Sequence, residues 1–323
     1  MTMRPLTRQR GVAVITALLL TTLAITIVAS LFWQQQVQVR SIENQRLQLQ
    51  KQWILRGALD WTKLILREDK RSDNRIGKKV DHLGEPWAVP LAETRLDQYV
   101  ENARAETDVP DAALSGSVVD AQSRFNLTNL FPPPRGPVNV DEVNAFKRLL
   151  TNARQDPALA QAAANLMQTA QGKPDSVPGT PSSSADSQAQ PLTISHVDDL
   201  LAVPGFTPEI LATLKDFIVV LPKSTAINVN TAPPEVLAAR IDKLSLAEAQ
   251  TLASGRENTW FKDTNDFKQR LGRQLPDGTG EIDVKTDYFL VNGKVRLNRA
   301  TMEMQALIDR SGSIPKIHWI REN

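Results

Sequence analysis

The feature that most constrains this chain is a run of apolar residues close to its N-terminus. From Val12 to Trp33 the sequence reads VAVITALLLTTLAITIVASLFW, without a charged residue, a glycine or a proline. About 20 apolar residues in a helix cross the roughly 30 Å hydrocarbon core of a bilayer. We therefore predict a transmembrane helix at residues 12–33, with Trp33 at the membrane–water interface.

The charges around this run predict its orientation. Arg4, Arg8 and Arg10 precede it, and no acidic residue lies among residues 1–11. Because positive flanks favour the cytoplasm, the N-terminus should be cytoplasmic and the bulk of the chain should lie on the far side, which in a bacterium is the periplasm. The alternative is a cleaved signal peptide with Ala29-Ser30 at its cleavage site, but such a peptide needs an apolar region of only about 7–15 residues.

The helical pattern continues beyond Trp33. Residues 34–69 contain no proline and one glycine, so we expect membrane helix and stem to form one rod of about 55 residues and about 80 Å. The segment Gln34–Gln50 is polar nearly all round, which is typical of a solvated stem. After Lys51, a face of apolar residues at helical spacing is expected to pack on the rest of the fold: Trp53, Ile54, Gly57, Ala58, Trp61, Leu64 and Ile65.

A short basic leader that ends in glycine, followed directly by a long apolar helix, resembles the type IV prepilin and pseudopilin class. The resemblance implies that a prepilin peptidase cleaves the Gly11–Val12 bond and methylates the new N-terminus at Val12. Members of this class nearly always carry glutamate at the fifth mature position, where this chain has Thr16. A carboxylate in the membrane is costly unless it is paired, whereas threonine bonds back to its own helix. Thr16 therefore indicates a subunit with no neighbour stacked above it.

Beyond the stem, the pattern changes several times along the chain. The alternation in Leu114–Asp120 and Arg124–Leu127 predicts a β-hairpin. The prolines of Phe131–Pro134 end regular structure. Val140–Gln171 is predicted to be helical, with an N-cap at Asp141.

A second change occurs at residues 172–191, which are polar and rich in proline and serine and are expected to form a disordered loop. From Glu281 onward, apolar and polar residues alternate with a period of two, which is typical of β-strands. Tyr288–Val291 and Lys294–Leu297 flank Asn292-Gly293, a strong signal for a hairpin turn. Two further strands are predicted at Thr301–Asp309 and Ile314–Ile320, so that an antiparallel sheet can cover the stem.

The region between these segments resembles paired helix-hairpin-helix units, in Ser195–Leu214 and Ile227–Leu271. DNA-binding units of this kind hold a phosphate on backbone amides in a hairpin with two glycines. The first hairpin here keeps Gly205 but has Thr207 at the second glycine position, and the second hairpin, Ile241–Ser245, has no glycine. The units are therefore expected to pack helices rather than to bind nucleic acid.

Composition and motifs narrow the function further. The net charge of +2 lacks the basic excess of a nucleic-acid binder, and the absence of cysteine excludes disulfides, thiol nucleophiles and thiolate metal sites. The sequence carries no nucleophile-elbow, zinc-protease, Walker A or Rossmann motif, and His82, His196 and His318 are far apart. We therefore expect a protein that is not an enzyme.

The phrase VVDAQSRFNLTNL at Val118–Leu130, the threonine at position 16 and the helical insertion together resemble the minor pseudopilin K family of type II secretion systems. The resemblance spans essentially the whole chain. It implies an α+β, pilin-like fold in which the transmembrane helix packs on an antiparallel sheet, with a large all-α insertion of helix-hairpin-helix, SAM-like modules. The implied organisation is a leader at 1–11, a transmembrane helix at 12–33, stem helix and first strands at 34–130, the insertion at 131–275 and closing strands at 276–323.

The resemblance also implies a function. A minor pseudopilin of this family forms or caps the tip of the pseudopilus and initiates its assembly, for export of folded proteins across the outer membrane. Its implied partners are the minor pseudopilins I, J and H, the prepilin peptidase and the inner-membrane assembly platform. The alternatives are a membrane-anchored helix-hairpin-helix DNA-binding competence protein and a minor pilin of a type IV pilus.

Calcium is the cofactor that the resemblance implies. Asp277, Glu281 and Asp283 surround two glycines, and carboxylates on a flexible loop suit Ca²⁺. Asp263 and Asp266 form a weaker second group. A solvated polar turn before a strand explains the same loop equally well, so both interpretations stay open from the sequence.

Overall fold

The computed structural model describes residues 10–77, 79–96, 111–132, 137–171, 193–272, 274–275, 281–298 and 300–322. Leader residues 1–9, the predicted loop at 172–191 and Asp277 lie outside the described residues. The helices are α1 (Arg10–Ile76), α2 (Val140–Asn152), α3 (Ala158–Gln171), α4 (Pro208–Leu214), α5 (Pro234–Arg240), α6 (Leu246–Asn258) and α7 (Thr264–Leu271), with 3₁₀ turns η1 (Pro86–Ala88), η3 (Ala121–Ser123), η4 (Leu127–Leu130) and η5 (Val197–Ala202). The strands are β1 (Leu91–Arg95), β2 (Ala112–Asp120), β3 (Phe125–Asn126), β4 (Ile218–Val219), β5 (Ile227–Asn228), β6 (Ile282–Asp283), β7 (Tyr288–Leu297), β8 (Ala300–Asp309) and β9 (Lys316–Glu322).

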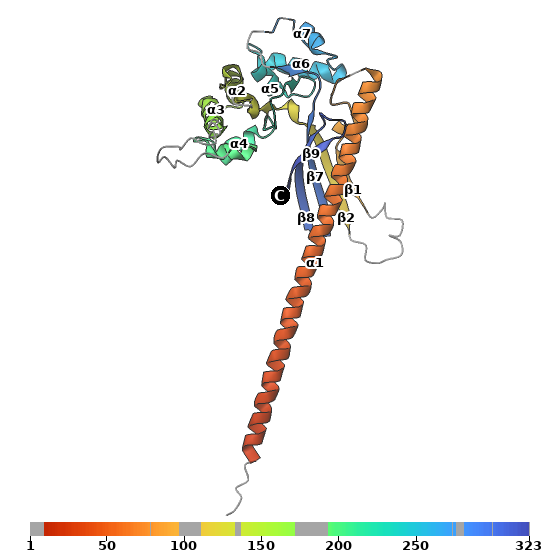
Figure 1. Cartoon of the computed structure of the whole chain (residues 1–323), viewed down its shortest axis with the longest axis vertical. Coiled ribbons are helices and arrows are strands. Elements are labelled where there is room, and N and C mark those ends of the chain that lie inside the picture. The colour runs from red at the N-terminus through yellow and green to blue at the C-terminus, as the bar shows by residue number, and fades with distance from the viewer. Residues whose placement is uncertain are drawn as a thin grey trace, which may run out of the picture.

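Helix α1 is a single rod of 67 residues, about 100 Å long, and is longer than the sequence predicted. Its N-terminal part projects away from the rest of the molecule, and residues 13–46 are exposed all round (Figure 1). Among the described residues, α1 is the one helix that is long and apolar enough to cross a membrane, with a mean hydropathy of 2.4 in its most apolar window.

The C-terminal part of α1 packs on the sheet through a face that only partly overlaps the predicted one. Leu55, Leu59 and Leu66 are buried against the sheet, whereas Trp53, Trp61 and Leu64 are 68%, 53% and 60% exposed. The prediction is therefore confirmed for Ile54, Ala58 and Ile65, which pack against this core, and was wrong for Trp53, Trp61 and Leu64. Both faces have helical spacing, and the pattern alone does not say which one the sheet will cover.

Five antiparallel strands form the sheet, in the order β1-β2-β7-β8-β9. The central pair β2 and β7 is in continuous register from Ala112↔Leu297 to Asp120↔Phe289. Alternate residues of β7 and β8 point at α1 and form a core with its leucines: Phe289, Val291, Val295, Met302, Met304, Ala306 and Ile308. The α+β, pilin-like arrangement expected from the sequence is present.

Two predicted hairpins are absent from this sheet. β2 does not pair with the segment after it, because Phe125–Asn126 pairs in parallel with β4 of the insertion. Asn292-Gly293 lies in the middle of β7 rather than in a turn. Gly293 is needed there for packing, because a Cβ on it would lie 3.2 Å from the Leu55 side chain. Continuous pairing of β7 with β2 and β8 thus overrides the local turn signal.

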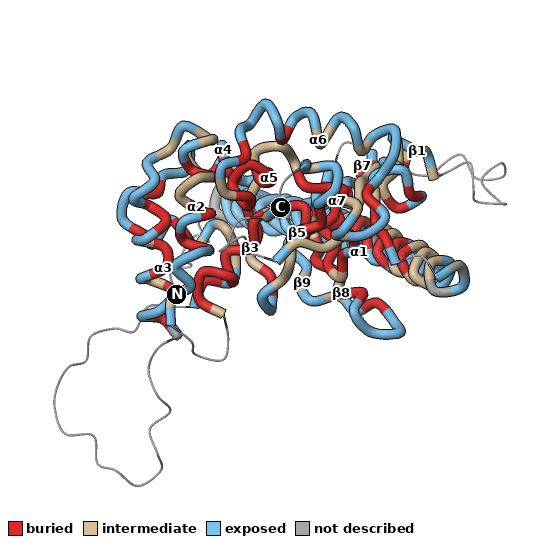
Figure 2. Tube along the Cα trace, turned by 90° about the horizontal axis from the view of Figure 1, so that it is seen from above, coloured by how far each residue is buried: buried red, intermediate tan, exposed pale blue. Residues whose placement is uncertain are grey.

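The helical insertion occupies residues 121–287, between the neighbouring strands β2 and β7. Its core unites η4 and β3 with the helices, so Phe125, Leu127 and Leu130 belong to the insertion. The insertion thus begins earlier than the predicted boundary at residue 131. Figure 2 shows buried residues on the inward sides of α2, α3 and α5.

The insertion also covers part of the second face of the sheet. Val219 and Leu221 pack with Leu290 and Leu307, on the side of the sheet opposite α1. The sheet is therefore held between the stem helix and the insertion. In Figure 1 the insertion lies over the end of the sheet that is farthest from the exposed part of α1.

Candidate functional site

The N-terminal end of α1 contains the predicted processing site. The helix already includes Gly11 and Val12, since it begins at Arg10. The Thr16 hydroxyl donates a hydrogen bond to the main-chain oxygen of Ala13 at 3.0 Å. The back-bonding that the sequence predicted for Thr16 is confirmed, and it satisfies this hydroxyl within its own helix.

A second apolar stripe on α1 lies outside the membrane segment. Trp53, Gly57, Trp61 and Leu64 follow one another at helical spacing on the face turned away from the sheet. A Cβ added to Gly57 would meet no atom within 4 Å. A glycine inside a helix costs about 0.5–1 kcal/mol relative to alanine, and the contacts described within this chain do not offset that cost. The stripe therefore has the composition of a contact surface for another helix.

The two helix-hairpin-helix turns cap their own helices. Thr207 caps α4 by accepting a hydrogen bond from the Ile210 N–H at 3.4 Å. Gly205, with a φ of +99°, makes the turn close, and a Cβ on it would lie 2.7 Å from Leu159. This glycine is therefore required by backbone conformation and packing, which needs no ligand.

The second hairpin is closed in the same way. Ser245 and Glu248 form a capping box at the start of α6, with each side chain bonded to the other's main-chain N–H. Asp242 in the turn lies 3.6 Å from Arg148. In the two hairpins, the Phe206 and Leu244 N–H groups are bonded to main-chain oxygens, and Asp242 adds a negative charge, so the geometry favours packing over DNA binding.

A serine, a histidine and an aspartate meet at the start of η5 without the geometry of a hydrolase triad. The Ser195 hydroxyl lies 2.9 Å from His196 Nδ1 and donates to Asp199 at 3.1 Å. The Asp199 carboxylate also accepts hydrogen bonds from the main-chain N–H groups of Ser195 and His196, so it caps the turn. In a triad the histidine lies between serine and carboxylate, whereas here the serine does.

The predicted calcium loop is described in part. Glu281 and Asp283 flank Ile282 at the start of β6, and alternate residues of an extended segment share a face. Asp283 accepts the Val284 N–H at 2.8 Å and lies 3.7 Å from Lys285. This pair offers the hard oxygen donors that suit Ca²⁺.

The weaker predicted metal group has another role. Asp263 accepts the main-chain N–H of Asp266 at the start of α7, and Asp266 pairs with Arg270 at 2.8 Å. Both carboxylates are therefore used to begin and stabilise α7.

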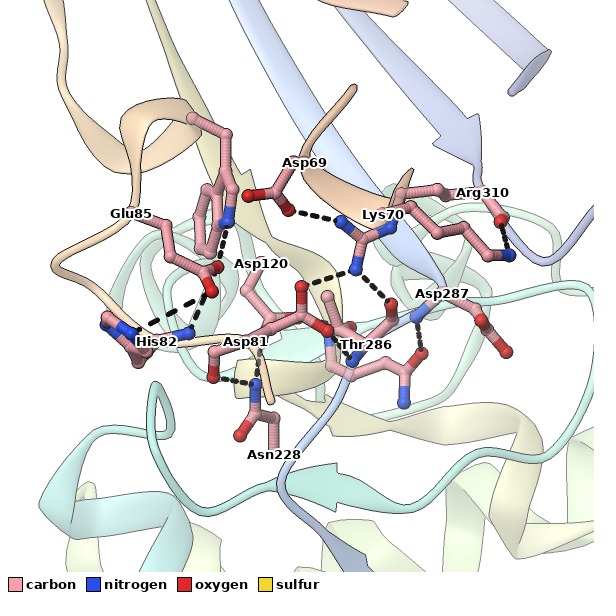
Figure 3. Close-up of polar contacts among 12 residues, drawn as sticks. Asp69, Lys70, Asp81, His82, Glu85, Asp120, Asn228, Thr286, Asp287 and Arg310 are labelled. Atoms are coloured by element: carbon pink, nitrogen blue, oxygen red, sulfur yellow. Dashed lines mark hydrogen bonds and ion pairs between the residues drawn. The ribbon is translucent and has the colours of Figure 1, made fainter. Parts of the chain in front are cut away.

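A polar junction that sequence reasoning missed joins α1, the sheet and the insertion (Figure 3). Arg310, at the end of β8, donates to Asp69 of α1 at 2.7 Å and to Asp81 in the following loop. Its Nη2 also donates to the Thr286 main-chain oxygen at 2.9 Å. The partners lie far apart in sequence, so no local pattern could have revealed them.

The insertion enters this junction through Asn228. Its amide donates to the Asp81 main-chain oxygen at 3.0 Å and to Asp120 at 2.9 Å. Asp120 accepts further hydrogen bonds from Thr231 and Thr286, both at 2.6 Å. Burial raises the pKa of Asp120 to about 6 in spite of these donors.

Glu85 and His82 complete the junction. The Trp87 indole N–H donates to Glu85 at 2.5 Å, and the His82 ring stacks on Trp260 of the insertion at 3.9 Å. Burial raises the pKa of Glu85 to about 8, and the neighbouring Asp69 carboxylate adds to the rise. The loop after α1 thus connects the stem directly to the insertion.

Comparison with known proteins identifies the family. Two family models, both described as type II secretion system protein K, match residues 123–223 and 227–285. A type II secretion system protein K from Pseudomonas aeruginosa is 28% identical over 327 residues, which cover 94% of this chain and 89% of the relative. These matches support the interpretation of the chain as a type II secretion system protein K. As a protein K it is a minor pseudopilin, a structural component of a secretion system that is anchored in a membrane by its N-terminal apolar helix.

Further relatives agree with this membership. A type II secretion system protein K from Aeromonas hydrophila is 25% identical over 306 residues, 87% of each chain. The fold is similar to a chain in the crystal structure of the GspK–GspI–GspJ complex from the type 2 secretion system of enterotoxigenic Escherichia coli, with a TM-score of 0.66 and 21% identity. That match covers 88% of this protein K and 99% of the other chain. The rival interpretation as a DNA-binding competence protein is not favoured.

Proposed function

We propose that this protein K caps the tip of a pseudopilus and starts its assembly together with the sibling minor pseudopilins I and J, with H also in contact. The observation that carries the proposal is the exposed apolar length of α1. It consists of two parts separated by the polar stem: the membrane segment at residues 13–33 and the stripe of Trp53, Gly57, Trp61 and Leu64. The similar solved structure is by its title a complex of GspK, GspI and GspJ, which supports these partners.

The capping role is supported by the position of the insertion. It lies over the end of the sheet that is farthest from the exposed part of α1, where a subunit added above would have to pack (Figure 1). Thr16, which bonds to its own helix, requires no partner amine from such a subunit. The role is mechanical rather than catalytic.

The proposed orientation follows from the basic leader. Arg4, Arg8 and Arg10 hold the N-terminus on the cytoplasmic side of the inner membrane, next to the assembly platform, until the leader is removed, and the sheet and insertion lie in the periplasm. The prepilin peptidase reaches the Gly11–Val12 bond from the cytoplasmic edge and methylates Val12.

Site-specific crosslinking of the full-length chain tests the partner surface. A photoreactive residue at Trp61 or Leu64, in membranes that contain I and J, should crosslink to one of them. The same residue at Lys63, which helical rotation places away from the stripe, should not. Equal crosslinking from all three positions, or none from any, would contradict the proposed surface.

Processing is tested by Gly11→Trp, with Arg10→Lys as the matched control. Gly11→Trp should leave an unprocessed precursor and stop secretion, because the peptidase requires a small residue before the cleaved bond. Arg10→Lys keeps the charge and should be processed normally. Normal processing and secretion with Gly11→Trp would remove the pseudopilin mechanism.

We also propose that the acidic loop binds calcium, with Glu281 and Asp283 as two of its ligands and Asp277 as a third. The donor chemistry of the described pair supports this assignment. Bound calcium would tie the loop before β6 to the insertion core. Chelation should then lower the melting temperature of the wild-type chain but not that of the triple variant Asp277→Asn, Glu281→Gln, Asp283→Asn. An unchanged wild-type melting temperature would show the loop to be a solvated turn.

A further inference from the structure

The junction below the insertion holds more negative charge than its cations balance. Asp69 and Asp73 of α1 and Asp81 and Glu85 of the following loop bring carboxylate oxygens within 4.8 Å of one another. Asp120 approaches from the end of β2. In so small a buried volume, carboxylates cannot all ionise unless each is matched by a cation or a proton.

Besides His82, whose ring lies 3.8 Å from Glu85, the basic side chains of Arg310 and Lys70 lie at this cluster and make different contacts. The Arg310 guanidinium binds Asp69 and Asp81. The Lys70 ammonium is directed instead at main-chain oxygens of Arg310 and Ser311, at 2.6 and 2.9 Å. Arg310 is therefore the cation placed among the carboxylates, and it is already shared between two of them.

Of the four clustered carboxyl groups, Asp73 and Glu85 are not bound by Arg310, and Glu85 is the buried one of these two. It is 8% exposed. One oxygen accepts from the Trp87 indole and, at 3.3 Å, from the His82 main-chain N–H, while the other lies 3.8 Å from the His82 ring. The N–H donors on Glu85 engage one of its oxygens, and the guanidinium and the Thr286 N–H engage both oxygens of Asp81.

The loop that carries Glu85 is also the connection between stem and insertion. Val284 accepts the main-chain N–H of Asp81 at 2.9 Å, Asn228 donates to the Asp81 main-chain oxygen, and Trp260 stacks on His82. A charge change at Glu85 therefore acts on the contacts that hold the insertion in place.

We propose that this junction is a protonation latch: Glu85 carries a proton while the loop of residues 79–89 fastens the insertion to the stem, and loss of that proton in alkaline medium loosens the insertion. This role is separate from the tip function and does not depend on it.

The sign of the pH dependence follows from the raised pKa of Glu85, about 8 against an ordinary 4.5. The folded chain keeps a proton that the unfolded chain has released, so stability falls as pH rises from about 4.5 to about 8 and then levels off. The pKa values of Asp73 and Asp120 are raised to about 6, so their contribution is largely lost by neutral pH. Burial raises the pKa of Asp69 as well. The share of Glu85 in the slope between about pH 7 and 8 is therefore the difference between the wild type and Glu85→Gln, and one proton corresponds to at most a tenfold change in the unfolding constant per pH unit.

The test is denaturant unfolding of the full-length chain in detergent between pH 6.5 and 9, followed by near-UV circular dichroism. The wild-type unfolding constant should rise several-fold per pH unit up to about pH 8. Glu85→Gln, which places a neutral isostere in the same contacts, should remove that rise, whereas the exposed control Glu43→Gln should keep it. An unchanged slope with Glu85→Gln would overturn the latch.

A second variant keeps the test decisive if Glu85→Gln fails to fold. Trp87→Phe removes a donor that favours the ionised carboxylate, so the fall in stability should extend to higher pH. If the stability of Trp87→Phe falls over the same pH range as that of the wild type, the assignment to Glu85 is contradicted. A wild-type slope abolished by EDTA would also overturn it, because a metal ion rather than a proton would then balance the charge.

Hydrogen exchange reports whether the insertion is what loosens. Amide protection factors, which correct for the intrinsic effect of pH, should fall in residues 226–232 of the wild type between pH 6.5 and 8.5. The protection factors of residues 226–232 should stay constant in Glu85→Gln, and those of the central strand β7 should stay constant in both the wild type and the variant. Equal loss of protection in β7 would indicate general unfolding and contradict a local latch.

Discussion

The two ends of α1 share one helix but differ in what their apolar residues do. In the membrane segment, apolar side chains are exposed on every side, and threonines such as Thr21 and Thr26 bond back to the helix. In the sheet segment, Leu55 and Leu59 are buried while Trp53 and Trp61 are exposed on the opposite face. One continuous helix therefore carries an apolar segment exposed on every side, a core face and a second exposed apolar face, and the sheet decides which apolar stripe becomes core.

The largest expected effect on the free energy of unfolding distinguishes the sheet segment of α1 from its membrane segment. Leu59→Ala removes a side chain that is 1% exposed between α1 and the sheet, and should destabilise the globular part by about 2–5 kcal/mol. Leu23→Ala, the same change in the membrane segment, should leave that unfolding transition unchanged. Chemical denaturation in detergent measures both. Equal effects would mean that the two segments are not energetically distinct.

A smaller effect is expected where the sheet makes room for α1. Gly293→Val would press against Leu55 and Met304, which lie 3.2 and 3.4 Å from the position of a Cβ, and should cost about 1–3 kcal/mol. Adding Leu55→Ala should recover part of that loss, so the double variant should be more stable than the sum of the single ones predicts. Strict additivity would show that the glycine does not set this contact.

The smallest effect has the opposite sign. Gly57→Ala, on the exposed stripe, should stabilise the isolated chain by about 0.5–1 kcal/mol, because a Cβ there meets no atom within 4 Å. In the assembled tip the same methyl group should weaken binding of a sibling helix. Gly205→Ala is the control, since its φ of +99° and the contact with Leu159 predict destabilisation. Destabilisation of the isolated chain by Gly57→Ala would show that this glycine serves the fold itself.

Much of the architecture could be predicted from local pattern. The long rod, the antiparallel strands Thr301–Asp309 and Ile314–Ile320 and the packing role of the hairpin helices depend on hydrophobic period and on caps within a few residues. The N-cap of α2 was misplaced by two positions, because Asn139 rather than Asp141 accepts the first amides. Both residue types favour this position, so the sequence does not choose between them.

Long-range features could not be predicted in the same way. The Asn292-Gly293 turn signal failed because two neighbouring strands pair along all of β7, which outweighs a local preference. The junction of Asp69, Asp81, Asn228 and Arg310 depends on the fold bringing together segments that no periodicity connects. Such a site becomes visible only once the sheet is assembled.

The point at which the insertion leaves the sheet has an evolutionary consequence. The chain departs after Asp120 and returns at Tyr288, and the register places Asp120 opposite Phe289. The two ends of the insertion are therefore neighbours, and a short turn could join them without disturbing any strand pair. A pilin-like ancestor could have acquired the whole insertion in a single step at one loop. Related proteins could carry different insertions at this loop on the same stem helix and sheet.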